Sequence, residues 1–352
     1  MEDFNFEEFE KYLIQGEPEQ KKKTYAWQTA IGLQAVDGLT PSKYLIETAR
    51  KNIEGDISIK DAQQLIKTYY ETKTNRDEND EDTEEADIVA SHITEILAED
   101  TFNFSPVELI NIHKRLFTGV FKFAGQIRQV NITKKEWVLQ GDTVFYSSCD
   151  LIKQTLDYDF EQEKNFDYKN ISMDETVKHI TRFTANLWQI HPFREGNTRT
   201  TAVFTIKYLR KLGFDVTNDI FAKHSWYFRN ALVRANYSNL QKQIYMDSSY
   251  LEKFFRNLLL NEKNELKNRY LVINAKELLK NIEKSSDKVA IKQKSSDIII
   301  EYLKNNATIN STVAQQITGL SPAGVRKIFA KLTEEKIISP HGANKNRTYS
   351  LN

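Results

Sequence analysis

Cysteine is almost absent from this chain, since Cys149 is the only one among 352 residues. A single thiol excludes an internal disulfide and any zinc site built from several cysteines. Glycine (12) and proline (6) are also scarce. Their scarcity, together with abundant Lys, Glu, Leu and Ile, favours a mainly helical fold.

Net charge and long apolar runs are missing as well. The 49 basic and 49 acidic residues cancel, so global charge does not attract nucleic acid or membrane, and such binding would need a local patch. No apolar run approaches the length that spans a bilayer, and the acidic N-terminal residues lack the apolar centre of a signal peptide. We therefore expect a cytoplasmic protein without a membrane segment.

The length predicts two or three domains. Eight acidic residues fall within 77–87, and such a block repels itself and resists burial, so we expect a linker or exposed loop there. The expected segments are an N-terminal helical region at 1–76, the linker at 77–87, a helical domain at 88–262, a connecting helix at 263–285 and a smaller domain at 286–352.

A nine-residue stretch, His191–Arg199, lies between two amphipathic patterns. Apolar residues recur at spacings of three or four before it and again after it, until Gly213, so we expect a helix–loop–helix junction. The second helix would begin near Gly196 and Asn197, with its free N–H groups and positive dipole end facing the loop. That arrangement is typical of a phosphate site, to which Arg199 could add a bidentate contact.

Two further residues of this loop suit phosphoryl chemistry. His191 has the side chain whose ordinary pKa of about 6.5 suits a general base at neutral pH. Glu195 offers a hard oxygen ligand for Mg²⁺, which takes few protein ligands and keeps waters and phosphates. A histidine at a helix end is more often structural, so the pattern rather than the single residue carries the prediction.

This stretch resembles the motif H-x-F-x-[DE]-G-N-G-R-x-x-R of Fic-domain proteins. It departs from the motif twice, because Thr198 replaces a glycine and Ala202 replaces the second arginine. The positions that match are His191, Phe193, Glu195, Gly196, Asn197 and Arg199.

The resemblance implies a Fic-type helical bundle that transfers AMP from ATP, with Mg²⁺ or Mn²⁺, to a Ser, Thr or Tyr hydroxyl of a target protein or of the chain itself. It implies that His191 is the catalytic base and that Glu195 binds the metal. The residues that it places around the nucleotide are Phe193, Arg194, Glu195, Gly196, Asn197, Thr198, Arg199, Tyr227 and Asn236. The last two would surround adenine and ribose, although aromatic residues on a helix are more often core.

A β-hairpin is expected before the motif. Residues 127–132 alternate apolar and polar side chains, and residues 137–139 and 144–146 flank the turn signal Gln140-Gly141-Asp142. In Fic proteins the corresponding hairpin is a flap that docks the target protein by strand addition. The alternative is a hairpin that only covers one end of the bundle.

Glu54 has two open interpretations. The segment Arg50–Gly55 resembles the inhibitory helix of Fic proteins, [ST]-x-x-x-E-[GN], with Arg50 in place of Ser or Thr. Glu54 would then inhibit, although Ala202 removes the arginine that usually pairs with it. Otherwise Glu54 is a solvated glutamate before a glycine at a helix end.

The C-terminal residues predict a winged helix. Residues 294–303, 311–317 and 321–332 are expected helices, with Ser311 and Ser321 as N-caps, and residues 337–339 and 348–351 are expected to pair. The cations that could meet DNA are Arg326, Lys327, Lys331, Lys345 and Arg347. This patch is small, so a role in protein interaction or dimerisation is equally open.

Two classes of function follow. The first is a Fic-type protein adenylyltransferase with a C-terminal winged helix, for which a homo-oligomer is compatible with the sequence. The second is a winged-helix regulator or scaffold whose Fic domain binds nucleotide but turns over weakly. A P-loop mechanism is not expected, because the sequence has no Walker A motif.

Overall fold

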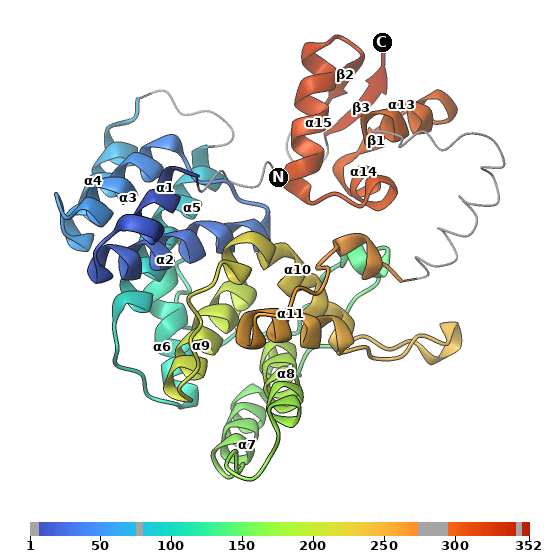
Figure 1. The fold of residues 1–352 in the computed structure, drawn as a ribbon. Coiled ribbons are helices and arrows are strands. Elements are labelled where there is room, and N and C mark those ends of the chain that lie inside the picture. The colour runs from blue at the N-terminus through green and yellow to red at the C-terminus, as the bar shows by residue number, and fades with distance from the viewer. Residues whose placement is uncertain (1–6, 75–79, 274–294, 343–346) are drawn as a thin grey trace. The chain divides into compact units, whose positions relative to one another are not determined.

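The computed structural model describes residues 7–74, 80–273, 295–342 and 347–352. These residues are mainly helical, with one short antiparallel sheet of three strands (Figure 1). The predicted fold class is therefore confirmed. Among the described helices, none is long and apolar enough to cross a membrane.

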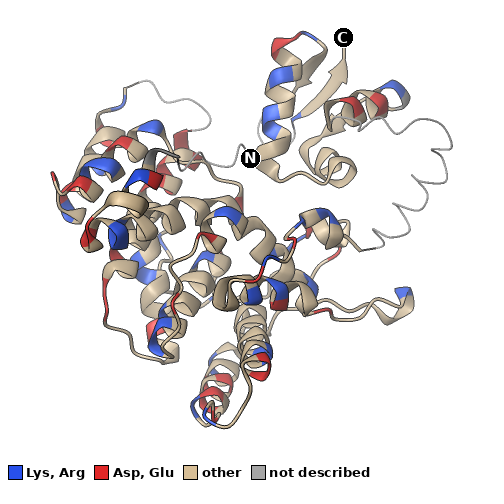
Figure 2. Ribbon diagram, in the orientation of Figure 1, with Lys and Arg blue, Asp and Glu red and all other residues tan. Residues whose placement is uncertain are grey.

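The chain divides into two compact units, which we describe separately. The helical unit is formed by residues 3–133 and 144–266, and the C-terminal unit by residues 134–143 and 267–352. Cationic and acidic side chains are mixed along the helices of both (Figure 2). The zero net charge of the whole chain is nevertheless not shared evenly, because residues 134–143 and 267–352 contain more Lys and Arg than Asp and Glu.

The helical unit is a bundle of helices that surrounds a buried aliphatic and aromatic core. Serine side chains cap several of these helices by accepting a hydrogen bond from a backbone N–H of the first turn, as at α3, α4, α6 and α8. The helices are α1 (Glu7–Gln15), α2 (Pro18–Leu33), α3 (Lys43–Glu54), α4 (Ile59–Thr72), α5 (Asp80–Ala98), α6 (Pro106–Phe117), α7 (Ile152–Lys164), α8 (Met173–Ile190), α9 (Asn197–Lys211), α10 (Ile220–Ala235) and α11 (Ser249–Leu260).

The helix–loop–helix junction expected around His191 is confirmed as α8, a loop and α9. Helix α8 begins with a capping box, in which the Ser172 hydroxyl accepts from the Glu175 N–H at 3.2 Å and the Glu175 carboxylate accepts from the Ser172 N–H at 2.8 Å. The predicted apolar stripe is buried, and its members are Val177, Ile180, Phe183, Leu187 and Ile190.

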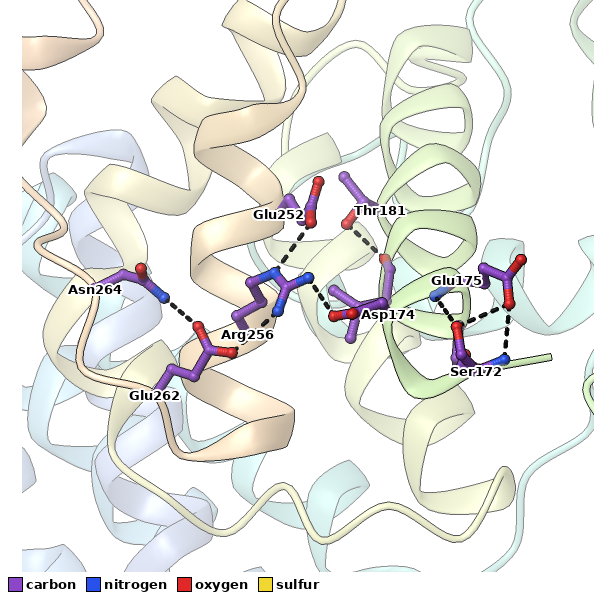
Figure 3. Close-up of polar contacts among 10 residues, drawn as sticks. Ser172, Asp174, Glu175, Thr181, Glu252, Arg256, Glu262 and Asn264 are labelled. Carbon is purple, nitrogen blue, oxygen red and sulfur yellow. Dashed lines mark hydrogen bonds and ion pairs between the residues drawn. The ribbon is translucent and has the colours of Figure 1, made fainter.

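An arginine of α11 anchors the start of α8 (Figure 3). Arg256 donates to Asp174 of α8, to Glu252 at 3.0 Å and to Glu262 at 3.0 Å. Each exposed ion pair contributes little alone, but the shared guanidinium fixes the two helices against each other. The helix that leads into the loop is therefore held at its far end.

The acidic linker predicted at 77–87 is wrong for its described part, because α5 begins at Asp80. Residues 75–79 lie outside the described residues. Asp87 is fully buried, and its carboxylate accepts from the Ser42 N–H at 2.8 Å and from the Tyr70 hydroxyl at 2.7 Å. These donors compensate for the lost water, which is why an acid from a charged block can sit inside the bundle.

The β-hairpin predicted over 127–146 is also wrong, because this segment contains no strand and residues Trp137–Leu139 form a short 3-10 turn, η2. Its two halves are joined near the turn by only a few backbone bonds, such as Glu136 N–H to Asp142 O at 2.9 Å. Other carbonyls of the segment, those of Val130 and Ser147, instead accept from the Arg128 side chain. Tertiary contacts have replaced the ladder that the alternating sequence indicated.

The C-terminal unit contains the helices and the terminal hairpin that the sequence predicted. A further short strand, β1, pairs with β3, so the sheet order is β1-β3-β2. Ser321 caps its helix as expected, whereas Asn310 rather than Ser311 caps the preceding one. The elements are α13 (Ser295–Asn305), β1 (Ile309–Asn310), α14 (Ser311–Thr318), α15 (Pro322–Glu334), β2 (Ile338–His341) and β3 (Thr348–Leu351).

The connecting helix predicted at 263–285 is not present in its described part. Residues 263–273 contain only a 3-10 turn, η4 (Asn268–Tyr270). The remainder, 274–285, lies outside the described residues, as does Lys345 of the predicted DNA-binding patch.

Candidate functional site

The loop between α8 and α9 is shaped by two residues with positive φ. His191 ends α8 with φ 50°, and Gly196 precedes α9 with φ 77°. A Cβ on Gly196 would lie 2.3 Å from the ring of Phe117, so both the backbone angle and the packing require glycine. The first bond of α9 runs from Thr200 N–H to Gly196 O, and the N–H groups of residues 197–199 precede it.

The side chain of Asn197 holds the loop closed. Its oxygen accepts from the Phe193 N–H at 3.0 Å, and its nitrogen donates to the Phe193 carbonyl at 2.8 Å. Both polar groups of the amide are therefore engaged with backbone. The phosphate site that the sequence predicted would therefore use the N–H groups of the first turn of α9 rather than this side chain.

His113 of α6 supports the same loop through a hydrogen bond to its backbone. Its Nδ1 accepts from the Gly125 N–H at 2.8 Å, which places the ring proton on Nε2, and Nε2 donates to the Glu195 carbonyl at 3.1 Å. The ring stacks on Phe193 with centroids 3.7 Å apart, and burial lowers the pKa of His113 to about 4. His113 is therefore a neutral, packed support at physiological pH.

The ring of His191 is buried at the end of α8. It stacks on Tyr146 with centroids 4.0 Å apart, and its Nδ1 lies 3.3 Å from the Trp188 carbonyl. A carbonyl only accepts, so this contact assigns the proton to Nδ1 and makes Nε2 the basic nitrogen. That tautomer is the one a general base requires.

Arg128 is a residue of the site that sequence reasoning missed. Its side chain is only 1% exposed, and it donates from Nε to the His191 carbonyl at 2.8 Å. An arginine within an alternating apolar–polar stretch is expected to face solvent, so the sequence held no signal for this contact. Tyr146 was likewise expected only as part of a strand.

Arg199 lies in the first turn of α9, but its guanidinium is occupied by acidic partners. Its Nε pairs with Asp37 at 2.8 Å, Nη2 with Glu85 at 2.6 Å, and Nη1 donates to Gln34 at 3.1 Å. The residue is 1% exposed and lies over the Phe117 ring. The structure therefore pairs Arg199 with carboxylates where the sequence predicted phosphates.

Neither departure from the Fic motif disturbs the packing. The Thr198 hydroxyl accepts from the Trp188 indole N–H at 3.0 Å and so joins the start of α9 to the end of α8. Ala202 is fully buried, one turn further along α9.

The remaining loop side chains, Arg194 and Glu195, are exposed. Arg194 lies over the ring of Phe123, 5.8 Å from its centroid. Within the described residues, no group of three His, Cys, Asp or Glu side chains could hold a metal ion. One exposed carboxylate beside a helix N-terminus nevertheless fits Mg²⁺, which accepts a single protein oxygen when phosphates and waters supply the others.

Of the two predicted adenine-site residues, Tyr227 lies on α10 and Asn236 directly follows the last residue of α10, and the polar groups of both are bound to backbone. The Tyr227 hydroxyl donates to the Tyr250 carbonyl at 3.2 Å, and Asn236 donates to the carbonyls of Ala185 and Leu232, both at 3.0 Å. These bonds join α10 to α11 and α8. The structure thus shows both side chains bonded between helices. These bonds are no evidence that either side chain contacts the loop.

Glu54 ends α3 beside α1. Its carboxylate accepts from the Tyr12 hydroxyl and lies 3.7 Å from the Lys11 ammonium. Gly55 follows with φ 91°, as expected for a helix end. Here Glu54 ties α3 to α1, and an inhibitory role for it stays a prediction.

Comparison with known proteins finds a family match for the part of the chain that contains this loop. A model of the Fic/DOC family matches residues 103–209. The chain is similar to the protein adenylyltransferase VbhT of Bartonella schoenbuchensis, at 31% identity over 108 residues, which cover 31% of this chain and 21% of that protein. It is also similar to the probable protein adenylyltransferase y4lH of Sinorhizobium fredii, at 27% identity over 141 residues, covering 40% of this chain and 69% of the relative.

Two further similarities were found. The probable protein adenylyltransferase Fic of Escherichia coli is 26% identical over 120 residues, 34% of this chain and 56% of its own. A solved Fic family protein from Desulfovibrio desulfuricans aligns with 92% of this chain and 87% of its own, at 12% identity and a TM-score of 0.38. The matches span only 21% of the Bartonella schoenbuchensis protein and 26% of a second relative, the protein adenylyltransferase of Bartonella henselae, so they concern one domain and not whole proteins. This chain contains a domain of the Fic/DOC family at residues 103–209, and the loop from His191 to Arg199 lies within it.

Proposed function

We propose that the chain is a protein adenylyltransferase that moves AMP from ATP to a hydroxyl group of a target protein or of itself. The observation that carries this proposal is the His191 ring, held with Nδ1 toward the Trp188 carbonyl, six residues before the first residue of α9. This observation supports a base and an anion site within one short loop. The relatives named as adenylyltransferases support the same choice.

The reaction balances with the groups of this loop. His191 Nε2 takes the proton of the target hydroxyl, whose oxygen attacks the α-phosphorus of ATP. The bond from that phosphorus to the leaving oxygen breaks, and pyrophosphate departs. A well-placed general base accelerates such a step by roughly 10²–10⁴-fold. The N–H groups of residues 197–199 hold phosphate oxygens at the positive end of α9.

Mg²⁺ would be held by Glu195, whose exposed carboxylate flanks these N–H groups. When bound, the ion neutralises phosphate charge. His113 fixes the Glu195 carbonyl and thereby the direction in which this residue leaves the loop. Asn197 keeps the loop from opening while the phosphates bind.

The experiment is incubation of the full chain with ATP labelled at the α-phosphate, with Mg²⁺ or Mn²⁺, followed by detection of label on protein. We expect label on the chain itself or on added protein, and we expect His191→Ala to abolish it. His341→Ala, which changes an exposed histidine of β2, is the matched control and should keep the activity. No label with the wild-type chain in either metal would overturn the proposal.

A second candidate is a regulator whose Fic domain binds nucleotide with little turnover. The observation that favours it is the pairing of Arg199 with Asp37 and Glu85, together with Ala202 in place of an arginine, which leaves two family phosphate cations unavailable. Nucleotide binding without transfer, together with a salt-dependent mobility shift of DNA by the C-terminal unit, would select this candidate.

A further inference from the structure

One guanidinium ties the catalytic loop to both halves of the segment that precedes the motif. We call residues 127–132 the first arm and residues 144–149 the second arm. Arg128 donates to the His191 carbonyl and, at 2.8 Å, to the Val130 carbonyl of the first arm. Its second terminal nitrogen donates to the Ser147 carbonyl of the second arm.

The backbone of Arg128 adds a second hydrogen bond to the same loop. Its N–H donates to the Pro192 carbonyl at 2.9 Å. Two consecutive loop carbonyls, those of His191 and Pro192, are therefore fixed by one residue. A planar guanidinium can serve several carbonyls at set angles, whereas an ammonium group offers a single point of charge.

The second arm also contacts His191 directly. The Tyr146 ring stacks on the His191 ring at an interplanar angle of 25°. One residue earlier, the Phe145 carbonyl accepts from the Gln189 amide of α8 at 3.1 Å. Three consecutive residues of the second arm are thus held, Phe145 by α8, Tyr146 by the His191 ring and Ser147 by Arg128.

The charge of Arg128 is not used for an ion pair. Among the described residues, no carboxylate lies within ion-pair distance of it, and burial lowers the pKa of its guanidinium below the ordinary value. A buried charge is costly unless hydrogen bonds replace its water, and here backbone carbonyls supply them.

We propose that Arg128 is a positioning residue, which sets the His191 ring and the second arm in one fixed arrangement. This inference rests on the proposed function for its kinetic consequence, but its structural consequence can be tested alone. Arg128 holds the carbonyl of the residue that bears the base, and through Ser147 it holds the arm whose Tyr146 ring packs against that base. Without the three hydrogen bonds of this guanidinium, the imidazole of His191 can rotate away from the direction of proton transfer.

The test compares Arg128→Lys with Arg210→Lys. Arg210 is a matched control, because it also donates from a partly buried guanidinium to a backbone carbonyl, that of Leu97 at 2.7 Å, at the other end of α9. In AMP transfer, we expect Arg128→Lys to lower kcat by about ten-fold or more while KM for ATP changes by less than about two-fold, since small misplacements of a reacting group are that costly. Arg210→Lys should leave both constants near the wild-type values.

The second readout does not need activity. The chain has six histidines, and the imidazole NMR signals of His191 are assigned by their loss in His191→Ala. In Arg128→Lys the His191 signals should shift and titrate differently from wild type, while those of the exposed His341 stay in place. Unchanged His191 signals, or a fall in kcat no larger than that of Arg210→Lys, would reduce Arg128 to a structural residue.

If Arg128→Lys does not fold, Gln189→Met takes its place. Gln189 is half-buried, and this change removes only the bond to the Phe145 carbonyl, so it loosens the second arm without leaving a buried charge. We expect a smaller shift of the His191 signals in the same direction, and no shift would overturn the inference. Absence of transfer by the wild-type chain would refute the proposed function alone, because the NMR comparison still decides the role of Arg128.

Discussion

Asp87→Asn should remove a pH dependence from the stability of the helical unit. Burial raises the pKa of the Asp87 carboxyl from 3.8 to about 6, although the Ser42 and Tyr70 donors oppose this rise. The folded chain therefore binds this proton more tightly than the unfolded chain does. Between pH 4 and pH 6, the free energy of unfolding should fall as pH rises, because the folded state holds a proton that the unfolded state has lost.

The size of the effect follows from the shift. A rise from 3.8 to about 6 is roughly two pKa units, and each unit corresponds to about 1.36 kcal/mol, so the full change is about 3 kcal/mol. Below about pH 3 the carboxyl is protonated in both states, and above about pH 7 it is ionised in both, so the curve should be flat outside this range.

Urea unfolding of wild type and variant at intervals from pH 3.5 to pH 7.5 gives the measurement. The other titrating groups cancel in the difference between the two free energies of unfolding, and the altered hydrogen bonds add a constant. That difference should become less favourable to wild type by about 3 kcal/mol over the whole range, with most of the change between pH 4 and pH 6.5. A flat difference would refute the raised pKa.

A carboxylate with the opposite shift provides the control. Asp61 caps the exposed start of α4, and hydrogen bonds from Ser58 lower the pKa of its carboxyl. Its stabilising effect is present above the unfolded pKa and is lost as pH falls. The difference between wild type and Asp61→Asn should therefore grow with pH where that of Asp87→Asn shrinks.

Three other predictions concern the site. Gly196→Ala should destabilise the chain by more than about 1 kcal/mol, measured by urea unfolding, because the left-handed backbone and the ring above it both reject a Cβ. Glu85→Gln should cost about 1 kcal/mol, since it removes one carboxylate from the buried Arg199 while leaving the other, and solvent screens the half-buried partner. If Glu54 inhibits, Glu54→Gly should raise the rate of AMP transfer. Tyr12→Phe releases the Glu54 carboxylate but keeps its charge, so it should not raise the rate. Equal effects of the two changes would mean that Glu54 only holds α1.

Local sequence determined the helices on either side of the loop and those of the C-terminal unit. The apolar stripe before His191, the serine caps and the glycine after α9 each act through neighbours within one or two turns, so spacing alone was enough to place α8, the loop and α9. The same reasoning placed α13, α14, α15 and the terminal hairpin. The six positions that match the Fic motif are also a local feature, and the family match to residues 103–209 bears out that resemblance.

Tertiary structure decided which polar groups meet. The alternating pattern before the motif indicated a β-hairpin, but Arg128 and Gln189 bind the carbonyls that a ladder would have used. The acidic block indicated a solvated linker, but Ser42 and Tyr70 supply donors that bury Asp87. In both cases the partners are distant in sequence, and periodicity carries no information about them.

The loop from His191 to Arg199 shows most clearly what local sequence determines and what the tertiary structure determines. The sequence alone determined that a histidine, a carboxylate and a helix N-terminus would stand together, because nine consecutive residues contain all three. Only the fold decided that Asn197 would close the loop on Phe193, that Arg199 would face Asp37 and Glu85, and that Arg128 would hold the His191 carbonyl. A short motif specifies its own backbone, whereas the direction of each side chain depends on which buried donors and acceptors the rest of the bundle brings within hydrogen-bond distance.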